Sequence, residues 1–185
     1  MGLKIVRILS WILVALIVIL SIILLFPVYW PITVYFLIVS LISIWFFKYD
    51  YNKHKDIALF EFFVLLIVLF HIVGVKWIYS AFPITNYLLH FLVGVILGIF
   101  TFSTLKKRNK MRFLDLFLIS ITIVFLLGVG WEIFEYFWDL IVTVKFGGIP
   151  AQSSRMDTLL DLISDLLGGI LGALVCLFKL HYKKA

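Results

Sequence analysis

Six long runs of apolar residues alternate with short polar segments along the chain. The runs lie near residues 5–26, 32–47, 57–75, 87–105, 113–138 and 157–178. Their lengths are close to the roughly 20 residues that an α-helix needs to cross the hydrocarbon core of a bilayer. The polar and apolar alternation of a lipid-facing barrel strand is absent, and open strands cannot satisfy their backbone groups in lipid. We therefore predict an all-α, polytopic membrane protein with six transmembrane helices.

The composition supports a membrane location and limits the domain organisation. Apolar residues make up 64% of the chain and charged residues 14%, whereas soluble domains are about 45–50% apolar. The segments between the runs are too short for a folded extramembrane domain, so we predict that residues 1–185 form a single membrane domain. The one cysteine, Cys176, excludes an intramolecular disulfide and a cysteine-cluster metal site.

Basic residues are concentrated on one side of the predicted membrane. If the N-terminus is cytoplasmic, 13 of the 16 Lys and Arg residues lie inside: Lys4, Arg7, Lys48, Lys53, Lys55, Lys106, Lys107, Arg108, Lys110, Arg112, Lys179, Lys183 and Lys184. Lys76, Lys145 and Arg155 lie outside. The positive-inside rule thus predicts a multi-pass protein of the cytoplasmic membrane with both termini inside. Because the net charge of +6 comes from these loops and tails, we expect the lipid bilayer, and no nucleic acid, as the partner.

Of the ten acids and four histidines, six lie near the predicted cytoplasmic ends of the spans, namely Asp50, His54, Asp56, Glu61, Asp115 and His181. The other eight all fall in the outer half of the predicted membrane: His71, His90, Glu132, Glu135, Asp139, Asp157, Asp161 and Asp165. In the last span, Asp157, Asp161 and Asp165 recur every four residues and therefore share one helix face, which Gly168 and Gly172 continue toward the cytoplasm. The last span therefore has an acidic outer part and a glycine inner part on the same face.

The fourth span has the same arrangement, because Gly94 and Gly98 lie below His90 on one face. Small residues let helix backbones approach closely in lipid. We predict that the fourth and sixth spans pack tightly through these glycines, with their polar ends at a shared site. The fifth span adds Glu132 and Glu135 at its outer end.

Most of these residues also have a structural interpretation. Asp157 can cap the last span, the acids of the fifth span can be solvated at a helix end, and His71 and His90 can form hydrogen bonds between helices. Asp165 is different, because an ionisable group near the bilayer midplane costs about 2.5–3.5 kcal/mol and usually faces a partner or a cavity. A functional role for Asp161 and Asp165 is thus favoured over a purely structural polar contact.

Several carboxylates that converge with a histidine cannot all stay ionised unless a cation or shared protons are present. Carboxylate oxygens suit Mg²⁺, Mn²⁺ or Ca²⁺, and an added imidazole permits Zn²⁺ or Fe²⁺. The predicted cofactor is therefore a divalent metal cation of unassigned identity. The predicted ligands are the acids of the fifth and sixth spans: Glu132, Glu135, Asp157, Asp161 and Asp165.

Three separated motifs resemble those of a known family. The runs GWEIFEY at 130–136 and DTLLDLISDLLGG at 157–169 resemble the WEI-[FY]-E and D-T-x-x-D-L-x-x-D-x-x-G patterns of the YjdF-like family of small membrane proteins, and His90-Phe91 is similar to its H-F element. The resemblance implies a polytopic membrane protein with these polar residues as its motif, and it implies no activity. A more distant similarity to VanZ-like proteins suggests cell-envelope or lipid-linked chemistry by analogy.

The run IPAQSSR at 149–155 is superficially similar to the P-G-x-S-R-S loop of undecaprenyl pyrophosphate phosphatases. It lacks the glycine, and the two glutamates of the fifth span are three residues apart rather than four, so we interpret the similarity as coincidence. The comparison still shows which side chains a lipid phosphatase would require. One of them is an arginine, such as Arg155, that binds the phosphate.

Three hypotheses remain open. In the first, the protein is an enzyme that binds a divalent cation and acts on a lipid-linked phosphate or headgroup, with His90 as ligand or general base and Arg155 as phosphate clamp. In the second, the same groups form a cation or proton pathway of a transporter, in a homo-oligomer because six short spans enclose little volume. In the third, the polar cluster only holds the helices of a structural or accessory protein together.

The predicted topology can be tested by cysteine accessibility. In a Cys176→Ser background, Ser153→Cys and Asn109→Cys should react with a membrane-impermeant thiol reagent from opposite sides of the membrane, because the basic residues place these two loops outside and inside. Labelling of both positions from the same side would contradict the topology and, with it, the shared depth of the polar residues.

Overall fold

The computed structural model describes residues 3–25, 34, 38, 55–74, 78–79, 81–108, 111–146, 150–152 and 154–182. Within these residues the regular structure is entirely helical and contains no strand, which confirms the all-α prediction there. The predicted span at 32–47 lies outside the described residues except for Val34 and Ile38.

The helices form two compact units. The first contains Met1–Thr85 and Val144–Ile149, and the second contains Asn86–Thr143 and Pro150–Ala185. The single membrane domain predicted from the sequence stays a prediction.

The first unit is built on a pair of apolar helices. Helix α1 (Leu3–Leu20), which the π-helical turn η1 (Ser21–Leu25) extends, packs against α3 (Lys55–Val73). Their buried residues have the spacing expected for one face of a helix: Val6, Leu13, Val14 and Ile17 on α1, and Ala58, Leu65 and Ile72, seven residues apart, on α3. The short helix α6 (Val144–Phe146) also belongs to this unit.

His71 has a structural partner in this first unit. Its Nδ1 lies 3.1 Å from the hydroxyl of Tyr79, and the two rings are in tilted contact. The backbone N–H of Tyr79 also donates to the carbonyl of Gly74. These contacts connect the end of α3 to the turn that follows it, which agrees with the structural interpretation of His71.

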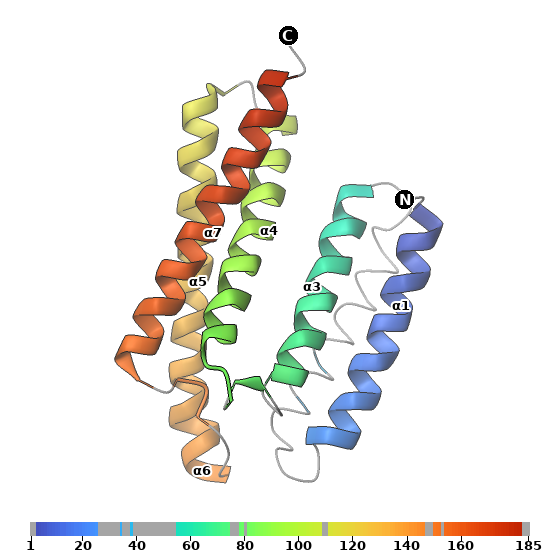
Figure 1. Ribbon diagram of the computed structural model, residues 1–185, viewed down its shortest axis with the longest axis vertical. Helices are drawn as coiled ribbons and strands as arrows, with labels where there is room; N and C mark the ends of the chain where they lie inside the picture. The colour runs from blue at the N-terminus through green and yellow to red at the C-terminus, as the bar shows by residue number, and fades with distance from the viewer. Residues whose placement is uncertain are drawn as a thin grey trace. The chain divides into compact units, whose positions relative to one another are not determined.

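The second unit is a three-helix bundle. It contains α4 (Ile84–Arg108, from Asn86 onward), α5 (Phe113–Trp138) and α7 (Arg155–Tyr182), which run side by side in Figure 1. The π-helical turn η3 (Asp139–Thr143) extends α5. Buried residues follow one stripe along α5, which packs against α7: Leu116, Ser120, Val124, Gly128, Glu132 and Glu135. Acidic residues therefore continue the buried apolar stripe toward one end of α5.

The backbones of α4 and α7 touch through glycines. A Cβ atom at Gly98 would lie 2.6 Å from the carbonyl oxygen of Gly169, which is closer than real Cβ atoms approach other atoms. A Cβ at three further glycines would meet backbone atoms of the facing helix even more closely: Gly94 at Asp165, Gly168 at Phe91 and Gly172 at Val95. The tight packing predicted for these two helices is confirmed.

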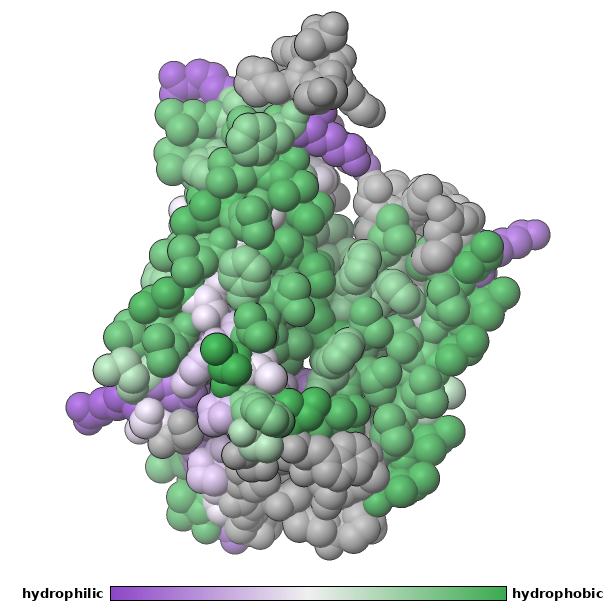
Figure 2. All heavy atoms as spheres, viewed as in Figure 1, coloured by the Kyte–Doolittle hydropathy of each residue, from purple (hydrophilic) through white to green (hydrophobic). Residues whose placement is uncertain are grey.

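The described helices have apolar outer faces. Four are long and apolar enough to cross a membrane, namely Lys4–Ile23, Ile84–Lys107, Phe113–Thr143 and Arg155–Lys179, and the apolar helix Ile57–Val73 is shorter. On the face seen in Figure 2, apolar side chains cover most of the described helices. Leu126, Ile133 and Leu171 are among the exposed apolar residues. The protein is thus a multi-pass helical membrane protein, whereas the count of six spans and the orientation of the termini stay predictions.

The glycine contact between α4 and α7 predicts a position-specific effect on stability. Gly168→Ala should lower the free energy of unfolding by about 1–3 kcal/mol, because the new Cβ has to push the backbone of α4 away at Phe91. Thermal unfolding of the purified protein in detergent measures this change as a lower melting temperature.

Gly130→Ala is the matched control, because no atom of the described residues, apart from the local backbone of α5, lies within 4 Å of a Cβ at this position. It should leave the melting temperature unchanged or raise it, since Ala is the better helix former. Equal losses in the two variants would contradict the role assigned to the close backbone contact.

Candidate functional site

His90 of α4 lies between two aspartates of α7. Its Nδ1 is 3.3 Å from Oδ2 of Asp165, and its Nε2 is 3.7 Å from Oδ1 of Asp161. The two aspartates are one helical turn apart, so one imidazole ring can reach both. The glycine contact begins next to these residues, at Gly94 on α4 and Gly168 on α7. It holds the two helices close enough for these short side chains to meet.

Asp161 is almost fully buried, with 2% of its surface exposed. The side-chain amide of Asn86 donates to both of its carboxylate oxygens, over 3.2 and 3.3 Å. Asn86 lies one turn before His90 on α4, and therefore on the same helix face. The sequence prediction missed Asn86, although its four-residue spacing from His90 was a signal that could have found it.

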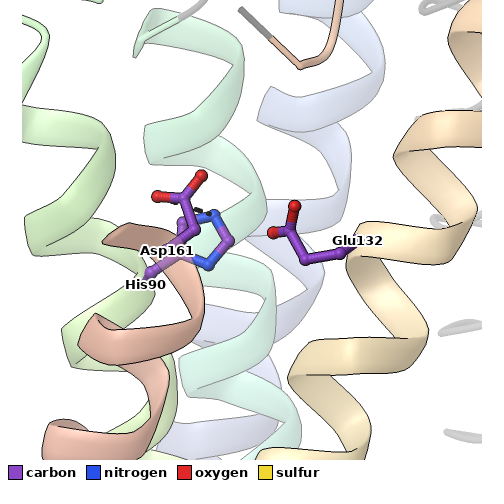
Figure 3. Close-up of side chains that lie close together, drawn as sticks. All are labelled: His90, Glu132 and Asp161. Atoms are coloured by element: carbon purple, nitrogen blue, oxygen red, sulfur yellow. Dashed lines mark ion pairs between the residues drawn. The ribbon is translucent and has the colours of Figure 1, made fainter. Parts of the chain in front are cut away.

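Glu132 brings a carboxylate from the third helix. It is 5% exposed, and its Oε2 accepts a hydrogen bond of 3.0 Å from the side-chain amide of Gln152. Its Oε1 is buried and has no hydrogen-bond partner among the residues that the structure describes. Figure 3 shows the side chains of Glu132, His90 and Asp161 directed toward one another from three different helices.

These three side chains form a group that can hold a metal ion. One potential ligand atom from each of His90, Glu132 and Asp161 lies within 4.8 Å of the other two. This set offers one imidazole nitrogen and two carboxylate oxygens. A cation placed between them would contact all three helices of the second unit.

Asp165 contacts the other ring nitrogen of His90. Its Oδ2 faces Nδ1 of His90, whereas Nε2 is the nitrogen on the Asp161 side. Asp165 is 5% exposed and packs against Gly128 of α5, where a Cβ atom would come within 2.6 Å of Oδ2. The glycine at 128 thus provides the space in which this carboxylate reaches His90.

Glu135 is the second buried glutamate of α5. It is 8% exposed, and its Oε1 accepts a hydrogen bond of 2.7 Å from the indole Nε1 of Trp131. It lies about one turn from Glu132 on the same buried stripe. The predicted pair of glutamates is therefore buried at the same end of α5, with the indole holding one carboxylate.

The first turn of α7 holds two further predicted residues. Ser154 accepts a hydrogen bond of 3.2 Å from the backbone N–H of Asp157, so the serine caps the helix and Asp157 occupies the third position of the first turn. Asp157 is half-buried, and Arg155 is exposed at the first residue of the helix. Arg155 comes six positions before Asp161, so it lies about 9 Å along the axis of α7 from that residue of the cluster.

This site buries several acidic side chains. Glu132, Glu135, Asp161 and Asp165 are all buried on α5 and α7, and two of them group with His90. The donors described above are otherwise neutral amide and indole groups. Burying unpaired charge is costly in a protein interior and more so in a membrane, so these acids cannot all be ionised without a compensating positive charge.

The comparisons with known proteins give one match. Residues 5–182 match the model of a family described as predicted membrane protein (DUF2238). No curated protein matches the chain, and no solved structure does. The match bears out the expectation of a membrane protein family, whereas the YjdF-like and VanZ-like names stay predictions.

Proposed function

We propose that this chain, which belongs to the DUF2238 family of predicted membrane proteins, binds a divalent cation and acts with it on a lipid-linked phosphate or headgroup. The cation would lie between His90, Glu132 and Asp161. The observation that carries the proposal is the buried Oε1 of Glu132, which has no hydrogen-bond partner among the described residues and belongs to a side chain directed toward His90 and Asp161 (Figure 3).

The physical argument is the cost of that oxygen. A buried polar atom without a hydrogen bond costs about 1–3 kcal/mol, and a charged one costs more. A cation near Nε2 of His90 and a carboxylate oxygen of Asp161 would remove this cost and would also balance part of the buried negative charge.

The donor set favours transition metals over the alkaline earths. Ca²⁺ and Mg²⁺ prefer shells made only of oxygen, whereas one imidazole with two carboxylates suits Mn²⁺, Fe²⁺ or Zn²⁺. Three protein ligands leave coordination positions for water or substrate, which is the usual arrangement of a catalytic rather than a structural metal site. A metal bound in this way can activate water or polarise a phosphoryl oxygen.

Other predicted site residues have supporting roles in this proposal. Asp165 holds the far nitrogen of His90 and so fixes the ring, as a carboxylate often does behind a metal-bound histidine. Glu135 and Asp157 lie within one turn of Glu132 and Asp161, and their ligand roles remain part of the proposal for a larger or second cation site.

A lipid-linked substrate fits the surroundings of the cluster. The three helices that carry it are apolar enough to cross a membrane, so the substrate would approach the cluster from the lipid. Arg155, exposed at the start of α7, is the residue that would bind the phosphate as a cationic clamp. The cell membrane, with the site in its outer half, is the proposed location.

A cation or proton transporter is the second candidate function. The buried carboxylates and the histidine support it, because such groups line proton and ion pathways in membranes. The contact between α4 and α7 counts against it, since their backbones touch at Gly94, Gly98, Gly168 and Gly172 and leave no passage along that seam.

Metal binding can be tested through thermal stability. In detergent and free of copurified metal, the wild-type protein should melt at a higher temperature with Mn²⁺ or Zn²⁺ than with chelator, since a ligand at a hundredfold excess over Kd stabilises by about 2.7 kcal/mol. Glu132→Gln and Asp161→Asn should remove this response. Asp115→Asn is the control, because Asp115 pairs with Arg112 at the other end of α5.

Asp165→Asn separates two roles for Asp165. If it acts behind His90, the amide oxygen can still accept the Nδ1 proton, and the response to metal should persist with a reduced affinity. If Asp165 is a ligand, the response should vanish. A flat melting temperature of the wild type with Mg²⁺, Mn²⁺, Ca²⁺ and Zn²⁺ would contradict the metal site.

Action on a lipid-linked phosphate predicts release of inorganic phosphate from vesicles that contain a polyprenyl diphosphate. Release should depend on the divalent cation and stop in Glu132→Gln. Arg155→Ala should lower kcat/KM by about 10- to 100-fold, the equivalent of a hydrogen bond between charged groups. Lys179→Ala, at the opposite end of α7, is the matched control. Absence of release with every cation would refute the enzymatic part of the proposal.

A further inference from the structure

A short segment before α7 is tied to the end of α5 through Asp139. The two carboxylate oxygens of Asp139 accept the backbone N–H groups of Ala151 and Gln152, over 2.7 and 2.9 Å. The hydroxyl of Thr143 donates to Oδ1 of Asp139 as well, over 2.9 Å. Asp139 opens the π-helical turn that follows α5, so one side chain fixes residues 151 and 152 against the helix that carries Glu132.

The side chain of Gln152 turns from this anchored backbone to Glu132. Its amide nitrogen donates to the backbone carbonyl of Glu132 over 2.9 Å and to Oε2 over 3.0 Å. These two bonds give the amide one fixed position. The second bond engages Oε2, whereas Oε1 is buried and has no hydrogen-bond partner among the described residues.

We infer that Gln152 is a positioning residue for the cation and that Asp139 acts through it. Gln152 holds Oε2 of Glu132 so that Oε1 is presented to His90 and Asp161 as a single-oxygen ligand. This inference rests on the proposed function, since it concerns the same cation site.

The chemical nature of the amide suits this role. A lysine or arginine in its place would neutralise Glu132 and compete with the cation, whereas a neutral amide fixes the carboxylate and leaves its negative charge available. Glutamate has a long side chain that loses rotamer freedom when it is fixed. Because Gln152 fixes Glu132 in the absence of the cation, less of that loss falls on the binding step.

Among the described hydrogen-bond partners of the three proposed ligands, Gln152 is the one that does not lie on a helix. Asn86 and Asp165, which hold Asp161 and His90, are placed by the regular geometry of α4 and α7. Gln152 lies before α7, and its position depends on the bonds to Asp139. A change at Asp139 should therefore reach the cation site without touching any ligand.

The test uses Co²⁺, whose visible absorption reports coordination geometry, with the full chain in detergent. Gln152→Met keeps the length of the side chain and removes the donor, and it should weaken Co²⁺ binding about 10- to 100-fold, as loss of an outer partner of a metal ligand typically does. The absorption spectrum of the bound Co²⁺ should change as well. Asp139→Asn should produce the same two effects.

The double variant distinguishes a single link from two separate effects. If Asp139 acts through Gln152, the double variant should bind Co²⁺ about as weakly as either single variant. Thr143→Val is the matched control, because it removes a hydrogen bond to Asp139 but leaves both backbone bonds that hold residues 151 and 152. It should bind Co²⁺ like the wild type, with the same spectrum.

The outcomes separate this inference from the proposed function. Wild-type affinity and spectrum in both Gln152→Met and Asp139→Asn, together with loss of binding in Glu132→Gln, would overturn the positioning role and leave the cation site standing. Absence of Co²⁺ binding by the wild type would overturn both. If Gln152→Met melts below the wild type in chelator, Asp139→Asn decides the question by the same criteria.

Discussion

The close approach of the backbones of α4 and α7 is the constraint on which the site depends. Glycines at 94, 98, 168 and 172 remove the side chains that would otherwise separate the two helices. Only at this separation can the short side chain of Asp161 receive two hydrogen bonds from Asn86, and His90 lie within 3.7 Å of both Asp161 and Asp165. The half of this helix pair that carries the glycines thus sets the geometry of the half that carries His90 and Asp161. The third helix joins by the same means, because Gly128 makes room for Asp165.

The residues around the site have distinct structural roles. Glycines set helix distance, neutral amides at 86 and 152 orient carboxylates, and Asp165 orients the histidine. None of these groups carries a positive charge that would balance the buried acids if they were ionised. In an apolar bundle, ionisable groups usually face a partner or a cavity. The excess of carboxylates over basic partners in the described contacts is therefore the feature that most clearly separates this cluster from a purely structural polar contact.

Much of this arrangement could be predicted from the sequence because helices repeat. The four-residue spacing of Asp157, Asp161 and Asp165, continued by Gly168 and Gly172, places them on one face, and the contact between α4 and α7 follows from it. Spacing along one helix cannot tell which nitrogen of His90 meets which aspartate, since that depends on the distance and rotation between helices. Gln152 and the capping role of Ser154 escaped prediction, because neither lies on a helix whose period would place it. The segment at 32–47 lies outside the described residues except at two positions.

The acidic character of α7 also constrains the order in which the bundle can assemble. Asp161 and Asp165 would each cost about 2.5–3.5 kcal/mol in the middle of a lone transmembrane helix, which weakens the case for α7 to enter lipid unaided. In the chain, α7 comes after α4 and α5, so Asn86, His90 and the glycines of α4 are synthesised before the acids that contact them. Insertion of α7 is then coupled to its docking against helices already in the membrane. The contact that shapes the site in the mature protein thereby also serves the biogenesis of its most polar helix.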